Sequence, residues 1–189
     1  MNEDYYPWGG EFTACNPKGC FAVVLLHIDY TPNEKVAIYG PLKTENIGVE
    51  KIVANVISNP HIRYIIICGE EIRGHRSGKS LIALHKNGID KQHKIIDSPG
   101  AIPYIENINN EAINRFQKQI EIIDLIGVKD KDIIDKKIEN CIEKAPASFG
   151  EPYIAIRIKP EVTVSLDDKR VIHSKIVIDY LGRIKKRGE

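Results

Sequence analysis

The sequence contains no run of about 18 or more apolar residues, so it predicts no segment that spans a lipid bilayer. Only four cysteines are present among 189 residues, which is too few for a disulfide framework, and we expect reduced thiols in a cytoplasmic protein. The 27 basic and 26 acidic residues leave a net charge of +1, so no strong overall field favours nucleic acid or an acidic membrane surface. The class that remains is a globular protein long enough to bury its own core.

Segments typical of strands and helices alternate over residues 1–145. Apolar runs predict strands at 21–28, 35–39, 64–68 and 120–126, and a weaker one that ends at Ile96. Helical spacing of apolar residues predicts helices at 45–58, 80–87, 110–118 and 131–143. This alternation predicts an α/β fold, a three-layer Rossmann-like arrangement around a mostly parallel sheet. The first 19 residues, rich in glycine, proline and aromatic residues, are expected to be irregular.

The periodicity changes after residues 146–152, which form the most plausible linker. Beyond it, apolar residues alternate with polar ones at 154–158, 162–164 and 176–180, a pattern that predicts strands. We therefore expect two domains: residues 1–145, and a small C-terminal antiparallel β appendage at residues 153–189.

The most informative segment is residues 69–80, Gly-Glu-Glu-Ile-Arg-Gly-His-Arg-Ser-Gly-Lys-Ser, which joins a predicted strand to a predicted helix. It places His75 between Gly74 and Gly78. Ligands of parallel α/β sheets bind beyond the carboxyl ends of the strands. Two more polar, glycine-containing segments, 44–51 and 98–107, follow the predicted strand ends at Tyr39 and Ile96. One edge of the sheet is therefore expected to collect all three segments.

Taken in chain order, the segments 44–51, 69–80 and 98–107 resemble the corrinoid-binding A subunit of the archaeal tetrahydromethanopterin S-methyltransferase, and the resemblance extends over residues 14–145. The resemblance implies that His75 is the lower axial ligand of cobalt in a cobamide, either 5-hydroxybenzimidazolyl cobamide or cobalamin. It also implies a methyl carrier of methanogenesis, in which Co(I) accepts a methyl group from methyl-tetrahydromethanopterin and passes it to coenzyme M, with other methyltransferase subunits as partners. The corresponding subunit of the membrane complex ends in a transmembrane helix, whereas residues 182–189 here are polar, so the resemblance implies either a soluble relative or a truncated form.

The resemblance further implies a set of cofactor-binding residues around His75. These are Thr44, Glu45, Asn46, Gly69, Glu70, Gly74, Gly78, Lys79, Pro99, Gly100, Ala101, Ile102 and Pro103. Many corrinoid proteins carry an Asp-x-His-x-x-Gly motif, in which the aspartate orients the histidine. His75 and Gly78 match its second half, but Arg73 stands in the aspartate position. The group that orients His75 therefore has to be Glu70, Glu71 or a residue elsewhere.

Several alternatives remain open from the residues themselves. Helix capping accounts for Thr44, and a plain turn accounts for the two prolines of residues 99–103. Residues 74–80 approach a phosphate-binding loop but have three residues between the glycines where that loop needs four, so a nucleotide-binding module is a weaker alternative. Cys15 and Cys20 are a poor match to zinc spacing. A relative that binds cobamide for storage, or for another methyl donor or acceptor, is the second alternative.

Overall fold

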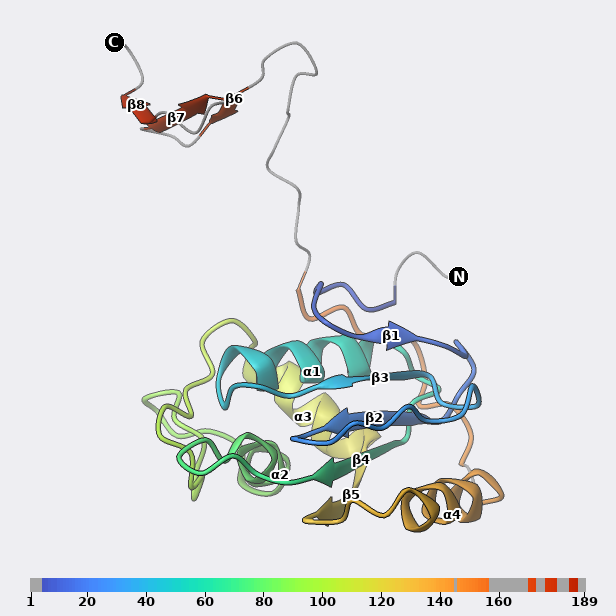
Figure 1. The fold of residues 1–189 in the computed structure, drawn as a ribbon. Helices are drawn as coiled ribbons and strands as arrows, with labels where there is room; N and C mark the ends of the chain where they lie inside the picture. The colour runs from blue at the N-terminus through green and yellow to red at the C-terminus, as the bar shows by residue number, and fades with distance from the viewer. Residues whose placement is uncertain (1–4, 145, 157–169, 173–175, 180–183, 187–189) are drawn as a thin grey trace. The chain divides into compact units, whose positions relative to one another are not determined.

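The protein is represented by a computed structural model, which describes residues 5–144, 146–156, 170–172, 176–179 and 184–186. The chain divides into two compact units, Met1–Arg157 and Ile158–Glu189. The first is an α/β unit with a five-stranded sheet and four helices among its described residues (Figure 1). The α/β class expected from the sequence is thereby confirmed.

The sheet of the first unit is mixed. Its strands are β1 (Thr13–Ala14), β2 (Phe21–Leu25), β3 (Ile38–Pro41), β4 (Tyr64–Gly69) and β5 (Glu121–Ile126), in the spatial order β1-β3-β2-β4-β5. Strands β3, β2, β4 and β5 are mutually parallel, and β1 pairs antiparallel with β3. The central strands β2 and β4 are apolar along almost their whole length, as expected for parallel strands that are covered on both faces.

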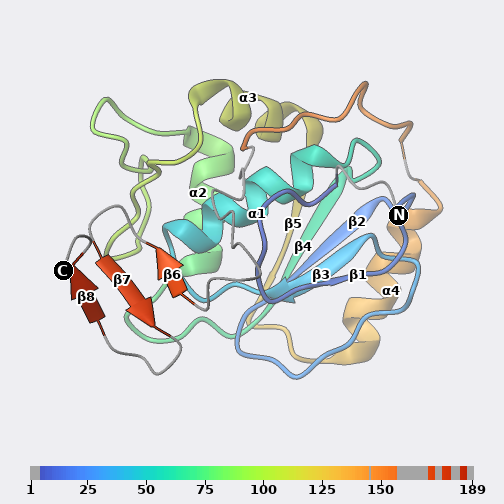
Figure 2. The same ribbon diagram turned by 90° about the horizontal axis from the view of Figure 1, so that it is seen from above.

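The helices lie on both faces of this sheet. They are α1 (Ile47–Ser58), α2 (Ser77–Asn87), α3 (Asn110–Gln119) and α4 (Lys131–Ile142). One core cluster joins Ala22 and Val24 of β2 to residues of α1, α2 and α3, and the other joins Phe21 and Val23 to Ile134 of α4. Figure 2 shows α4 across the sheet from the other three helices. The alternation of side chains along β2 therefore fills two separate cores.

Helix ends follow local sequence signals. The Asp130 side chain accepts hydrogen bonds from the N–H groups of Asp132 and Ile133 and so begins α4, as the sequence predicted. Gly88 ends α2 with φ of +70°, a conformation that glycine adopts readily. Helix α2 begins at Ser77, three residues earlier than predicted, and α1 begins at Ile47, two residues later.

Three sequence expectations about strands are wrong. No sheet strand ends at Ile96, because residues 88–105 form a loop held by isolated bridges such as Ile89–Ile95. The opening arm contains a strand, β1, because Thr13 and Ala14 pair with β3. The strand predicted from residue 154 is absent over residues 154–156, where Ala155 and Ile156 pack on the core of the first unit instead.

The second unit contains a small antiparallel sheet. Its strands are β6 (Arg170–Ile172), β7 (Ile176–Asp179) and β8 (Ile184–Lys186), with β7 in the centre. Strand β7 falls within the predicted segment 176–180, whereas β6 and β8 were not predicted. The expected strand at 162–164 and residue Ile158 lie outside the described residues.

Candidate functional site

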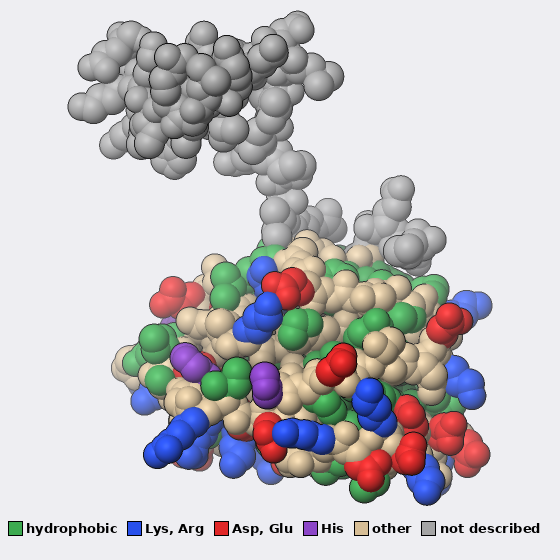
Figure 3. All heavy atoms as spheres, in the orientation of Figure 1, with side chains coloured by type: hydrophobic (Ala, Val, Ile, Leu, Met, Phe, Trp, Pro, Cys, Tyr) green, Lys and Arg blue, Asp and Glu red, His purple; other side chains and the backbone are tan. Residues whose placement is uncertain are grey.

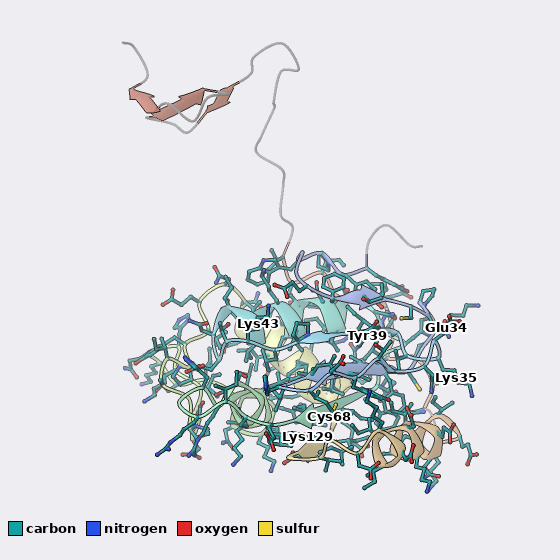
Figure 4. All side chains as sticks on the ribbon, in the orientation of Figure 1. Glu34, Lys35, Tyr39, Lys43, Cys68 and Lys129 are labelled. Carbon is teal, nitrogen blue, oxygen red and sulfur yellow. The ribbon has the colours of Figure 1, made fainter. Side chains whose placement is uncertain are left out.

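The three polar segments singled out in the sequence meet at one edge of the sheet. A cavity of about 350 Å³ lies at the carboxyl ends of β2, β3 and β4. Its lining comprises Leu25, Leu26, His27, Pro41, Leu42, Lys43, Glu70, Glu71, Ile72, His75 and Ser77. Figure 4 places Lys43 and Lys129 at this edge, with Glu34 and Lys35 at the opposite one. This is the edge at which open parallel sheets bind ligands.

His75 lies on the exposed loop of residues 70–76, between β4 and α2. Its side chain is 63% exposed, and its Nδ1 lies 3.4 Å from Oε2 of Glu45, whose side chain is only 5% exposed. The sequence left the group that orients His75 open between Glu70, Glu71 and a residue elsewhere. In the structure the acidic residue beside His75 is Glu45, which lies in the segment that precedes α1.

The Glu45 carboxylate is held by backbone N–H groups. Its Oε1 accepts hydrogen bonds from the N–H of Ala101 at 2.8 Å and of Ile102 at 3.3 Å. Burial alone would raise the pKa of Glu45, but these two hydrogen bonds, with a smaller contribution from His75, outweigh burial and lower the pKa below its ordinary value. At neutral pH Glu45 therefore only accepts hydrogen bonds, so a hydrogen bond between the two side chains requires the Nδ1–H tautomer of His75, in which Nε2 faces away from Glu45.

The loop that supplies these N–H groups, residues 98–107, packs tightly against α1 and α2. Ser98 Oγ donates to Ser80 Oγ of α2 at 2.8 Å, and Ser80 Oγ in turn donates to the carbonyl of Arg76. A Cβ atom on Gly100 would lie 2.6 Å from Ser80 Oγ and 3.0 Å from Glu45 Cγ. Gly100 is therefore required by the approach of this loop to Glu45 and α2, whatever ligand binds outside.

Glu71 occupies the beginning of α2. Its Oε1 accepts a hydrogen bond from the N–H of Lys79 at 2.8 Å, while its Oε2 is buried and has no hydrogen-bond partner among the described residues. Burial raises the pKa of Glu71, although the Lys79 N–H and the charges of Lys79 and Arg76 oppose the rise. The helix N-terminus that a phosphate-binding loop offers to phosphate is thus already filled by a carboxyl group of the protein.

Contacts within the protein account for several of the other predicted site residues. Thr44 Oγ1 accepts a hydrogen bond from the N–H of Gly48 in the first turn of α1, although the N-cap position is Asn46 and not Thr44 as expected. A Cβ on Gly78 would meet Leu26 and Ile126 at 3.0 and 3.2 Å, and one on Gly69 would meet Ile28 at 2.8 Å, so packing within the protein requires both glycines.

The remaining predicted residues leave more room at the surface. A Cβ on Gly74 would meet no atom within 4 Å. Glu70 forms an ion pair with Lys129 at 2.8 Å. Pro103 is buried, and the exposed members of the set are Thr44, Glu70, Gly74, Lys79, Pro99, Ala101 and Ile102, with Asn46 and Gly100 half-buried.

Other histidines have different surroundings. His27 is exposed and lines the same cavity as His75, while His85 Nε2 lies 2.7 Å from the carbonyl oxygen of Ile120 and its ring packs edge-on against Phe116. Figure 3 shows histidine side chains at the surface beside hydrophobic and basic groups. Within the described ranges no group of three or more histidine, cysteine or acidic side chains is arranged to hold a metal ion.

Comparison with known proteins identifies the family. The model of the MtrA family, the A subunit of tetrahydromethanopterin S-methyltransferase, matches residues 2–185. The chain belongs to this family. The family's A 1 subunit from Methanothermobacter thermautotrophicus is 49% identical over 154 residues, which cover 79% of this chain and 65% of that protein. A protein from Methanosarcina acetivorans, named as the A subunit of the putative methyltransferase Mtx, is 42% identical over 187 residues, which cover 96% of this chain and 94% of that protein.

Members of the MtrA family differ in length. The chain spans 65% of the length of the Methanothermobacter thermautotrophicus relative and 76% of that of the family member from Methanosphaera stadtmanae, to which it is 40% identical over 188 residues. Among the described residues, no helix has both the length and the apolar composition that crossing a membrane requires.

Proposed function

We propose that this chain is the cobamide-carrying subunit of a methyltransferase, with His75 as the axial ligand of cobalt. The observation that carries the proposal is the pairing of an exposed imidazole with a buried, hydrogen-bonded carboxylate at the edge of the sheet where ligands bind. Family membership supports it, since the relatives are named methyltransferase subunits. A bound cobamide supplies a cobalt centre that can accept and release a methyl group.

The residues present fit such a cofactor. Glu45 holds the proton of His75 on Nδ1 and fixes the ring, so that Nε2 is the nitrogen available to the metal. Gly74 leaves open space beside the ring, which a flat macrocycle needs in order to approach the backbone. Ile47, Ile72 and Ile102 are 46%, 55% and 60% exposed on the three segments around the pair, and provide apolar surface for the rim of a macrocycle. The chain's own part is therefore to bind the cofactor and to orient the His75 ring toward it.

Substrates and partners belong to the proposal as well. We infer methyl-tetrahydromethanopterin as donor and coenzyme M as acceptor, reached through other subunits in the cytoplasm, because relatives carry the name of that enzyme. The nearly full-length match to the Mtx protein supports a second candidate, a cobamide carrier with a different donor or acceptor. We also retain the three-layer Rossmann-like description, which the two core clusters on opposite faces of the sheet support.

A nucleotide-binding role is less well supported. Glu71 fills the N-terminus of α2, and a phosphate placed there would meet a carboxyl group. Lys79 remains exposed in the first turn of α2, so its side chain is free to reach an anionic group of a cofactor from outside the helix terminus.

The test is reconstitution with hydroxocobalamin followed by paramagnetic resonance of the Co(II) form. With the protein labelled with ¹⁵N-histidine, we expect the wild-type spectrum to show one strongly coupled ¹⁵N, distinct from the ¹⁴N of the cofactor's own base, and His75→Ala to lose it while keeping the fold, because the His75 side chain is largely exposed. His27→Ala is the matched control, since His27 is exposed in the same cavity and should leave the spectrum unchanged. A nitrogen signal that persists in His75→Ala and disappears in His27→Ala would assign the ligand to His27 instead.

A further inference from the structure

Glu50 is a second buried carboxyl group near the site, on α1 and five positions after the buried Glu45. It is 1% exposed and accepts three hydrogen bonds. Its Oε1 accepts from the backbone N–H groups of Glu106 at 2.5 Å and Asn107 at 2.7 Å, and its Oε2 accepts from Nδ2 of Asn107 at 2.6 Å. No lysine, arginine or histidine of the described residues lies within ion-pair distance of it. A buried acid held only by N–H donors of one loop acts on that loop.

The loop held by Glu50 is the loop that holds Glu45. Residues 101 and 102 donate to Glu45 just before α1, and residues 106 and 107 donate to Glu50 about one turn further along. Between these two attachments the segment is held together by a hydrogen bond of its own, from the N–H of Tyr104 to the carbonyl of Ile102 at 3.0 Å, and Ile95 of the same loop donates to the carbonyl of Pro103 at 2.8 Å. Displacement of residues 106–107 is therefore expected to move the N–H groups that keep Glu45 in place.

We propose that Glu50 is a positioning residue for His75, which it reaches through the 98–107 loop and Glu45. By fixing residues 106 and 107 on α1, Glu50 keeps the Ala101 and Ile102 N–H groups on Glu45 Oε1, and this leaves Glu45 Oε2 facing His75 Nδ1. The importance of His75 rests on the proposed function, but the coupling from Glu50 to His75 is a property of the protein without a cofactor.

The coupling can be measured by NMR on the full chain at one fixed pH. The readouts are the hydrogen-exchange rates of the Ala101 and Ile102 amides and the ¹⁵N shifts of the His75 ring, which report where the ring proton resides. Glu50→Gln keeps one carbonyl oxygen but turns an NH₂ group toward the NH₂ group of Asn107, and Asn107→Ala removes only the side-chain bond. We expect exchange at residues 101 and 102 to accelerate at least tenfold in Glu50→Gln and less in Asn107→Ala, and the His75 ring shifts to move in the same order.

The matched control is Asp130→Asn on the opposite face. Asp130 also accepts two backbone N–H groups, those that begin α4, so its replacement weakens the same kind of contact away from the site. We expect it to change neither readout, because its contacts lie at the start of α4. If both Glu50→Gln and Asn107→Ala behave like Asp130→Asn at residues 101, 102 and 75, Glu50 merely stabilises its loop and the inference is overturned. A wild-type protein without a nitrogen ligand to cobalt would refute the proposed function and leave this coupling intact.

Discussion

Glu45 Oε2 faces His75 Nδ1 across 3.4 Å, although the two residues are 30 positions apart in the chain. The aspartate that stands two residues before the histidine in many corrinoid proteins is replaced here by Arg73. The carboxylate beside His75 comes instead from the segment just before α1. Because Glu45 belongs to a different segment from His75, its position is set by the loop that holds its carboxylate. The geometry of His75 is therefore linked to the packing of residues 98–107.

Glu45→Gln should weaken cobamide binding without unfolding the protein. Glutamine can still accept from the Ala101 N–H, but it presents an NH₂ group to His75 Nδ1, which shifts the ring proton to Nε2 and blocks the ligand bond. We expect the Kd for hydroxocobalamin to rise about 10–100-fold, the usual effect of losing a residue that orients a metal ligand. The control is Glu106→Gln, which removes an exposed carboxylate from the same loop. Equal affinities of the two variants would contradict the role given to Glu45.

The stability that Glu71 contributes should depend on pH in the direction opposite to that of an ordinary ion-paired carboxylate. Its folded-state pKa is raised above the usual 4.5, so folding favours the protonated form. Stability contributed by this group is complete below pH 4.5 and declines as the pH rises toward the folded-state pKa. Glu71→Gln removes this penalty while keeping an acceptor for the Lys79 N–H. Urea unfolding should therefore show Glu71→Gln to be more stable than wild type at pH 7, by an amount that shrinks toward pH 4.

The same urea series on Glu143→Gln supplies the control, since Glu143 is exposed at the end of α4. Its stability difference from wild type should stay nearly constant with pH. A wild-type protein whose stability, relative to Glu71→Gln, increases from pH 4 to pH 7 would show that burial does not control Glu71.

Gly74 and Gly127 form a matched pair for testing contact with the cofactor. Their φ angles are +91° and +90°, and a Cβ on either would meet no atom within 4 Å. Alanine at each position should lower stability by a similar amount, about 1–2 kcal/mol, because both force the same left-handed backbone on a residue with a Cβ. Only Gly74→Ala should also weaken hydroxocobalamin binding, since Gly74 adjoins His75. Loss of binding in both variants, or in neither, would remove Gly74 from the site.

The sequence predicted which segments form the site, but it did not predict the long-range contacts that hold them together. The strands that end at Leu25 and Gly69 are apolar along their length, and the polar segments that follow such strands have to meet at one edge of a parallel sheet. The segment after Ile96 reaches the same edge by another route, since Glu45, Glu50 and Ser80 hold it there. These contacts join residues up to 57 positions apart, and no local pattern encodes them.

Predictions of secondary structure held where the signal lies within a few residues and failed where the contact is more distant in the sequence. Asp130 and Gly88 begin or end helices through contacts within a few residues, so their roles could be predicted. Ile154 and Ile156 alternate as in a strand, but Tyr153, Ala155 and Ile156 pack against the core cluster and residues 154–156 pair with no strand, which the local pattern could not reveal. Glu71 was missed as a helix cap because it lies eight residues before the N–H that it accepts.

Truncation within residues 147–158 should separate the folded first unit from the rest of the chain. The guanidinium groups of Arg63 and Arg115 lie 5.2 and 4.7 Å from the centre of the Phe149 ring, and the Tyr153 N–H donates to the carbonyl of Ile57. A chain ending at Arg157 keeps these contacts, and we expect it to unfold with nearly wild-type stability and to bind hydroxocobalamin within a few-fold of wild type. A chain ending at Ser148 loses them and should be less stable by about 2 kcal/mol or more, since several half-buried apolar side chains are lost and full burial of one large side chain contributes about 1.5–3 kcal/mol. Calorimetry of the two shortened chains tests the first expectation: equal Tm values would show that residues 149–157 do not stabilise the first unit. The binding measurement tests the second: if the chain ending at Arg157 binds hydroxocobalamin tenfold more weakly than wild type, residues 158–189 contribute to the site.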